Sequence, residues 1–130
     1  MTHIGARYRG YVADGGRGFT YGPANSEKMA IIAAAARAVE AGLAAAQPGM
    51  TAMELNAVIQ QVLVKSNYEQ YSNEVRGHGT GHATGMDPEE EAPRIGPGNK
   101  TVLQENMVFT LKATITVPNV GVLRTERPCG

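Results

Sequence analysis

A glycine-rich segment, residues 77–85, restricts the folds open to this chain more than any other stretch. It contains four glycines and two of the three histidines in the sequence. Glycine loses the most backbone freedom on folding and weakens helices and strand interiors, so the segment is predicted to be a loop rather than a helix or a central strand. Because glycines also let a backbone approach a ligand closely, we expect His78 and His82 to belong to a site. The alternative is that both histidines only close turns.

The sequence on either side of this segment predicts strands and helices in separate groups. Residues 4–21 are typical of a strand pair, and residues 107–117 and 120–125 are typical of a second pair joined by a turn. Between the pairs, one helix is expected from Ser26 to a breaker at residues 47–49, and another from Thr51, which forms a capping box with Glu54. The residues expected on the buried stripes are Met29, Ile32, Ala36, Val39 and Leu43 in the first helix and Leu55, Val58, Ile59 and Val62 in the second. This order indicates an α+β fold in which two helices cover one face of a mostly antiparallel sheet.

The length of 130 residues suits one domain, and 12 basic residues balance 12 acidic ones, so the formal net charge is zero. A neutral chain offers no basic field to nucleic acid or to a lipid surface, and we expect neither as a partner. The longest apolar stretch is too weak to span a membrane, and no secretion signal is expected from the first residues. A single cysteine, Cys129, cannot form an internal disulfide. These features predict a cytoplasmic protein.

Acidic residues in two of the expected strands are a second candidate site. Asp14 and Glu126 lie in β-type sequence, where a carboxylate that points inward needs a partner. Together with a histidine they would suit a divalent metal ion whose coordination is completed by water. Period-two alternation also permits both carboxylates to point outward into solvent. The glycine-rich segment lacks the Gly-Lys-Ser/Thr ending of a phosphate loop, so a phosphate site is not expected.

Several segments, in order along the chain, resemble the pita-bread family of M24 peptidases, which includes Xaa-Pro aminopeptidases, prolidases, methionine aminopeptidases and creatinase. They are residues 4–14, 48–51, 77–82, 106–110 and 124–126. The resemblance implies the second half of a pita-bread domain, with residues 1–130 forming a partial M24-like domain. It also implies a two-metal hydrolase that cleaves a C–N bond of a small peptide or amide, as Xaa-Pro dipeptidases and aminopeptidases do.

The resemblance implies a set of five metal ligands, of which this sequence keeps three. Asp14, His82 and Glu126 occupy ligand positions, whereas His3 stands where an aspartate belongs and Lys112 where a glutamate belongs. A lysine ammonium about 4 Å from a divalent ion would be repelled by several kcal/mol even at an effective dielectric of about 20. We therefore expect a degenerate site with one weakly held divalent ion (Mn, Co, Zn or Fe), bound by Asp14, His82 and Glu126 and also by His3, or with no ion.

The remaining matches assign roles to cationic residues. Our hypothesis is that Lys112 lies between Asp14 and Glu126 and replaces the charge of a metal. The resemblance makes His78 a substrate-contacting histidine and Arg124 the arginine that precedes the last ligand. In a metal-free, creatinase-like amidohydrolase, His78 or His82 would be the general base, and Arg124 or Lys112 would stabilise negative charge. A third alternative is a non-catalytic relative kept for binding or assembly.

Two further expectations concern the surroundings of the site. Residues 87–91 occupy the stretch where the family has a further histidine, and their glutamates predict a solvated turn, with an acidic rim for cationic substrates as the alternative. The resemblance also implies a homodimer, since peptidases of the family are often dimers, and it implies that the chain is a fragment of a longer protein or that its missing half comes from elsewhere. Alone, it should expose apolar faces of its sheet and helices.

Overall fold

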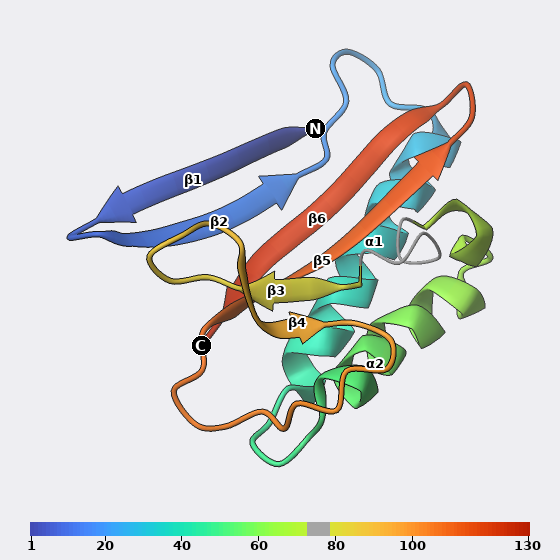
Figure 1. Cartoon of the computed structure of the whole chain (residues 1–130). Helices are drawn as coiled ribbons and strands as arrows, with labels where there is room; N and C mark the ends of the chain where they lie inside the picture. The colour runs from blue at the N-terminus through green and yellow to red at the C-terminus, as the bar shows by residue number, and fades with distance from the viewer. Residues whose placement is uncertain (73–78) are drawn as a thin grey trace.

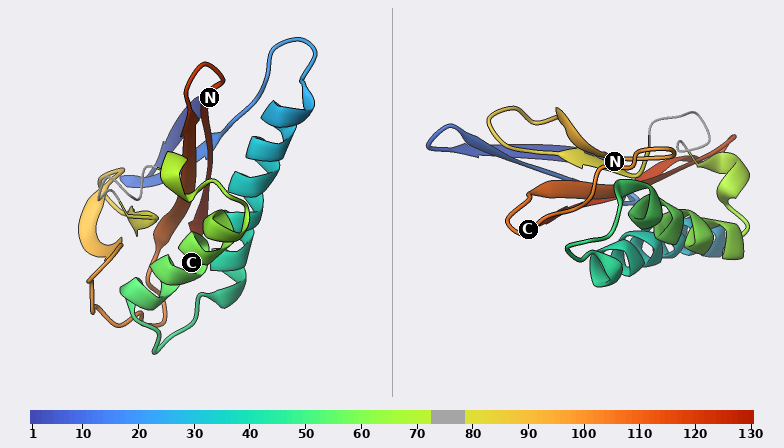
Figure 2. Two further views of the ribbon diagram at one scale, coloured as in Figure 1. Left: turned by 90° about the vertical axis from the view of Figure 1, so that its right-hand side faces the viewer. Right: turned by 60° about the horizontal axis from the view of Figure 1, so that its bottom comes forward.

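The computed structural model of the chain describes residues 1–72 and 79–130. Within these residues, six strands form one antiparallel sheet in the order β1-β2-β6-β5-β3-β4. The helices α1 and α2 lie side by side on one face of this sheet, as Figure 1 and Figure 2 show. The α+β class and the layer arrangement predicted from the sequence are thereby confirmed.

The elements have the following bounds. The strands are β1 (Thr2–Tyr8), β2 (Tyr11–Arg17), β3 (Gly81–Ala83), β4 (Glu90–Ile95), β5 (Phe109–Val117) and β6 (Gly121–Cys129). The helices are α1 (Ser26–Ala45) and α2 (Ala52–Lys65), and a short 3-10 helix, η1 (Glu69–Tyr71), follows α2. The first strand pair is shorter than the predicted range 4–21, because β2 ends at Arg17 and Phe19 lies 55% exposed in the connection to α1.

Side-chain caps explain why both helices begin where the sequence predicts. The Asn25 side chain accepts a hydrogen bond from the Lys28 backbone N–H at 2.9 Å. At α2 the Thr51 hydroxyl accepts from the Glu54 N–H at 3.2 Å, and the Glu54 carboxylate accepts from the Thr51 N–H at 2.8 Å. These two bonds form the expected capping box and satisfy donors that the helix leaves unpaired.

The buried stripe of α1 differs from the predicted one. Met29 is 52% exposed, and three other members of the predicted stripe are only half-buried: Ile32, Ala36 and Leu43. The buried side of the helix consists of Ile31, Ala34, Ala35, Ala38, Val39 and Gly42. Small residues are needed there because the helices approach closely: a Cβ on Gly42 would lie 2.8 Å from the Ile59 side chain. The prediction was correct for Val39 and wrong for the other four positions, because hydrophobicity alone ranks methionine and leucine above alanine and glycine.

The buried side of α2 is closer to the prediction. Leu55 and Ile59 are buried as expected, whereas Val58 and Val62 are half-buried. Leu63 is buried instead, one turn beyond Ile59, so the buried leucine and isoleucine side chains keep the i, i+4 spacing of a single helix face.

Part of the glycine-rich segment is a strand, which corrects the loop prediction. Gly81–Ala83 form β3, which lies between β5 and β4 in the sheet. A glycine is needed at the start of β3 because a Cβ on Gly81 would collide with the carbonyl oxygen of Thr110 in β5. Glycine here allows two backbones to approach closely, and composition does not distinguish this role from that of a loop glycine. Gly77 and His78 lie outside the described residues.

The hairpin formed by β1 and β2 joins the rest of the sheet along a short boundary. The register pairs between β2 and β6 are Gly16 with Glu126 and Arg17 with Thr125. The Arg17 guanidinium donates to the carbonyl oxygens of Glu126 at 2.7 Å and of Gly16 at 2.8 Å, which fastens the two strands together. The last residues of β2 anchor the hairpin to β6, and its turn projects beyond the helices (Figure 1).

The side of the sheet that faces the helices supplies the hydrophobic core. Its strand residues include Leu111, Ala113, Ile115 and Leu123, all buried in one cluster with the inner faces of α1 and α2. Because side chains alternate along a strand, the residues between them point to the opposite side, which α1 and α2 leave open (Figure 2). The described part of the chain contains no helix of the length and apolarity that a membrane span requires.

Candidate functional site

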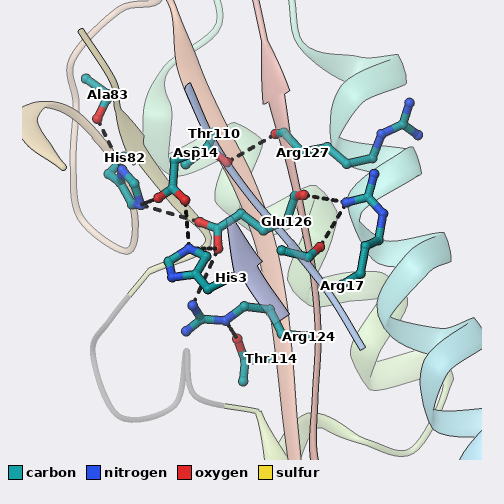
Figure 3. Close-up of polar contacts among 11 residues, drawn as sticks. His3, Asp14, Arg17, His82, Ala83, Thr110, Thr114, Arg124, Glu126 and Arg127 are labelled. Carbon is teal, nitrogen blue, oxygen red and sulfur yellow. Dashed lines mark hydrogen bonds and ion pairs between the residues drawn. The ribbon is translucent and has the colours of Figure 1, made fainter. Parts of the chain in front are cut away.

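The open face of the sheet, opposite α1 and α2, carries the polar residues that the sequence singled out. Lys112 of β5 and Glu126 of β6 are register partners, and Glu126 also pairs with Gly16 of β2. Directly opposite residues of antiparallel strands point to the same side, so these three share the open face. Asp14 precedes Gly16 by two residues and lies on the same side, and β3 brings His82 to it, as Figure 3 shows.

A row of register partners crosses this face. His3 of β1 pairs with Gly16, Gly16 pairs with Glu126, and Glu126 pairs with Lys112. Gly16 has no side chain, so it leaves a gap in the row through which His3 reaches Glu126. A Cβ added to Gly16 would already lie 3.5 Å from both the Glu126 carboxylate and the His3 ring. The glycine therefore allows side chains two strands apart to touch.

His3 lies between the two acidic side chains. Its Nε2 atom is 2.7 Å from Asp14 Oδ1 and 3.0 Å from Glu126 Oε2 (Figure 3). Ionised carboxylates only accept hydrogen bonds, so Nε2 carries a hydrogen and donates it to this pair. Asp14 is 7% exposed and Glu126 is fully buried, so His3 donates to two carboxylates that water reaches poorly.

His82 approaches the same carboxylates from β3. Its Nε2 atom is 3.5 Å from Glu126 Oε1 and 3.8 Å from Asp14 Oδ2, and its Nδ1 atom donates to the Ala83 carbonyl oxygen at 3.1 Å. Burial lowers the pKa of His82, but the attraction of Glu126 and the bond to Ala83 outweigh burial, so the pKa of His82 is raised above its ordinary value. His82 therefore holds a proton more readily than a free histidine.

Glu126 is the most enclosed charge of the site. Arg124 Nη1 lies 3.4 Å from Glu126 Oε2, and Arg124 Nε donates to Thr114 Oγ1 at 2.8 Å, which fixes the guanidinium beside the carboxylate. Burial raises the pKa of Glu126. The attraction of His82 and of neighbouring cationic side chains lowers it by a larger amount, so the net shift is downward. Oε1 is buried without a hydrogen bond of ordinary length, because the His82 nitrogen is 3.5 Å away.

Lys112 does not lie between the carboxylates, contrary to the hypothesis from the sequence. The ion pairs of the described residues include none that joins Lys112 to Asp14 or Glu126, and His3 occupies the position between them. Spacing along the chain could not reveal this exchange, because it depends on the gap at Gly16 in the neighbouring strand. The charge of Lys112 still acts over a longer distance and lowers the pKa of Glu126.

A cavity of about 450 Å³ adjoins the site at β3 and β4, lined by His82, Glu89, Glu90 and Arg94. The Glu90 carboxylate accepts hydrogen bonds from two backbone N–H groups of the preceding turn, at 2.8 and 3.3 Å, so Glu90 has a structural role. Glu89 is exposed, and its charge helps to raise the pKa of His82. Arg94 was not predicted from the sequence. Its place beside His82 follows from their register pairing, which can be inferred only once β3 is recognised as a strand.

The donor atoms of the site are close enough together to hold a metal ion. One ligand atom from each of His3, Asp14 and Glu126 lies within 4.8 Å of the others, close enough to meet at one ion. His82 donates Nδ1–H to a carbonyl, as metal-ligating histidines commonly do. Two carboxylates beside two cationic side chains carry no net negative charge, which weakens their attraction for a pair of dications. Among the described residues, His3, Asp14 and Glu126 form a group that could hold a divalent ion.

Known proteins share this architecture and sequence. The family model described as metallopeptidase family M24 matches residues 1–128. The chain is 34% identical over 130 residues to an Xaa-Pro dipeptidase of Lactobacillus delbrueckii subsp. lactis, covering 100% of this chain and 34% of that protein. It is 32% identical over 126 residues to an Xaa-Pro dipeptidase of Pyrococcus horikoshii, covering 97% and 34%. Among solved structures it is similar to the prolidase from Pyrococcus furiosus, with a TM-score of 0.88 and 32% identity over 97% of this chain and 36% of that one.

The match covers the whole of this chain but only part of each relative. The chain spans about a third of the length of the relatives it matches. Over that span its sheet and two helices have the arrangement found in the solved prolidases, which confirms the expected α+β pita-bread fold. The family model, the sequence identity and the shared fold agree, and the chain belongs to the metallopeptidase family M24.

Proposed function

We propose that the chain carries the substrate-facing site of a hydrolase that cleaves a C–N bond of a small peptide or amide. The observation that carries this proposal is the convergence of His3, Asp14, His82 and Glu126, from four strands, on the open face. Such a cluster combines a proton-transfer group with buried carboxylates that orient it, which amide hydrolysis requires. Membership of the M24 family and similarity to proteins named Xaa-Pro dipeptidase support a peptide substrate.

In the metal-free form of the site, His82 is the proposed general base. It would take a proton from a water molecule whose oxygen attacks the amide carbon, and return it to the amine that leaves when the C–N bond breaks. Its raised pKa and its position beside a cavity support this role. Arg124 and Lys112 are proposed to stabilise the negative charge that develops on the amide oxygen. His78, outside the described residues, is the alternative general base.

The proposed cofactor is at most one divalent ion (Mn, Co, Zn or Fe), held by Asp14, His82 and Glu126, with His3 as a further donor. When bound, such an ion would polarise the amide carbonyl. It would be held weakly because the neighbouring cationic side chains already neutralise the two carboxylates. A metal-free, creatinase-like site is the second candidate, favoured by the Nε2–H of His3 that already bridges both carboxylates.

We further propose that residues 1–130 form part of a larger M24 domain in a cytoplasmic protein. The partner that completes the domain would be the remainder of a longer polypeptide or a second subunit in a homodimer. The exposed apolar side of the β1–β2 hairpin supports this proposal, since Ile4, Tyr8 and Tyr11 are 65%, 74% and 69% exposed. The chain also spans only about a third of its relatives, which supports a need for further structure.

Hydrolysis assays test the proposed function. The protein would be incubated with Gly-Pro and with small amides, after treatment with EDTA and after addition of manganese. His82→Gln is expected to lower kcat by about 10²–10⁴-fold, as loss of a general base does. The matched control is Lys100→Ala, an exposed substitution in the connection between β4 and β5, which should leave the rate unchanged.

The assay separates the candidates. A rate that survives EDTA and falls in His82→Gln supports the metal-free site, and a rate restored only by manganese supports the single ion. No hydrolysis of any of these compounds by the protein with its domain completed would overturn the proposed function and leave the non-catalytic alternative.

A further inference from the structure

Two cationic side chains balance the two carboxylates of the site. Asp14 and Glu126 contribute two negative charges, and Arg124 and Lys112 contribute two positive charges close enough to act on the carboxylates. The sum is zero before either histidine is counted. Buried carboxylates need a cationic partner, either a metal ion or a basic side chain. Here basic side chains of the same sheet neutralise the two negative charges.

His3 occupies the space that an ion bridging the carboxylates would need. Its Nε2 atom lies 2.7 Å from Asp14 Oδ1 and 3.0 Å from Glu126 Oε2, with its hydrogen directed at this pair. A divalent ion coordinated by both oxygens would sit about 2.0–2.2 Å from each, in the volume now filled by Nε2 and its hydrogen. An ion can enter only if His3 turns away or loses that hydrogen, and either change removes an existing bond.

Lys112 opposes a second ion in another way. It is the register partner of Glu126 on β5, at the position where the family resemblance implies a metal-ligating glutamate. The exchange removes one negative charge and adds one positive charge beside the carboxylate that two ions would share. Lys112 is half-buried, so solvent screens this repulsion only in part.

We propose that His3 and Lys112 have together replaced the two-metal centre in this chain, His3 by donating a hydrogen bond between the carboxylates and Lys112 by compensating their charge. The open face is then held together by side chains alone, and its stability is independent of divalent ions. The proposal does not depend on the proposed hydrolysis, because it concerns the stability and ion content of the folded protein.

Thermal unfolding of the unaltered protein is the first test. The protein would be stripped with EDTA, and Tm would be measured alone and with added manganese, cobalt or zinc. An ion present at 100 times its dissociation constant would raise Tm by roughly 10 °C in a domain of this size. We expect a rise of less than about 5 °C at a millimolar concentration of any of these ions. A larger rise, or binding of two ions in metal analysis, would overturn the proposal.

Reversal of both exchanges is the second test. His3→Asp combined with Lys112→Glu restores a set of four carboxylates with His82, and we expect this variant to bind about two ions and to gain roughly 10 °C or more in Tm on adding manganese. The matched control is His3→Asn with Lys112→Gln, which removes the same side chains but adds no negative charge. The control should show no such gain.

The two tests remain decisive if a variant is unstable. If the restored variant folds only in the presence of manganese, while the control variant does not respond to it, the result supports the proposal. If the restored variant and the control respond equally, or if neither binds ions in metal analysis, His3 and Lys112 are not what excludes the metal pair, and the proposal fails.

Discussion

Lys112 and Glu126 face each other across the β5–β6 pair, yet the ion-pair contacts of Glu126 come from His3, His82 and Arg124. His3 lies two strands away and reaches over Gly16, which has no side chain to obstruct it. The nearest neighbour in the ladder therefore acts on Glu126 only through its charge. Which side chains touch across this sheet depends on where a glycine leaves room, as well as on which residues are register partners.

Replacing Lys112 should raise the pKa of both buried partners. The Lys112 charge lowers the pKa of His82 and of Glu126, so Lys112→Met removes a positive charge that disfavours protonation of both groups. NMR titration of the His82 ring measures the shift. Lys65→Met, at the exposed end of α2, is the control and should leave the His82 titration where it is. An unchanged or lower His82 pKa in Lys112→Met would contradict this reading of the charges.

The stability of the protein should be greatest in mildly acidic solution. The pKa of His82 is raised in the folded state, so its contribution is complete below its unfolded pKa of about 6.5 and is lost as pH rises through the higher folded value. The pKa of Glu126 is lowered, so its contribution is complete above about 4.3 and is lost as pH falls through the lower folded value. Urea unfolding at a series of pH values should show a plateau between these limits. In His82→Asn the decline on the alkaline side should be smaller, and an undiminished decline would assign it to another group.

A larger side chain at Gly16 should separate His3 from Glu126. Gly16→Val places methyl groups where the His3 ring and the Glu126 carboxylate now meet, and we expect a loss of about 1–3 kcal/mol in the free energy of unfolding. Gly16→Ala is the control, because its Cβ would make contacts of 3.4 Å and longer, which are ordinary. Urea unfolding measures both variants, and equal losses in the two would mean that backbone freedom rather than the gap is what matters.

Gly81 should be the least replaceable strand glycine of the site region. In Gly81→Ala the new Cβ meets the Thr110 carbonyl oxygen, so β3 must separate from β5 at a cost of about 3 kcal/mol or more. Gly5→Ala is the matched control on β1, since its Cβ would find only the Ala13 carbonyl oxygen at 3.6 Å, and its effect should stay within about 0.5 kcal/mol. Chemical denaturation of the two variants provides the comparison. A mild effect of Gly81→Ala would show that β3 can shift along β5.

The cap of α2 offers a local test away from the site. Thr51→Ala removes the hydroxyl that accepts from the Glu54 N–H, and we expect a loss of about 1 kcal/mol in the free energy of unfolding. Thr51→Ser keeps the hydroxyl and should retain nearly all of the stability. Urea unfolding distinguishes the two, and equal losses would point to the threonine methyl group rather than the hydrogen bond.

Local signals in the sequence were sufficient for most of the fold. The capping box at Thr51 and Glu54 located the start of α2, and the β-branched residues of β5 and β6 located the second hairpin. The predictions that were wrong concern residues whose burial depends on packing against another element. Met29 was expected inside, but α1 buries its alanines because Gly42 lets Ile59 approach, and nothing in the sequence of α1 itself records the position of α2.

The candidate site was also predictable only in part. Asp14, His82 and Glu126 were named from motif positions, and the structure brings them together on one face. The place of His3 between the carboxylates followed from register across three strands, which spacing along one chain does not encode. The hypothesis for Lys112 failed for that reason, while His78 lies outside the described residues and its role stays a prediction.

The short boundary between β2 and β6 divides the site in two. His3 and Asp14 belong to the β1–β2 hairpin, whereas His82 and Glu126 belong to the body of the sheet. Two of the four contacts between these histidines and carboxylates join the two parts, His3 with Glu126 and His82 with Asp14, and the other two lie within one part. A hairpin that detached from β6 would take one acid and one histidine with it and leave one of each behind.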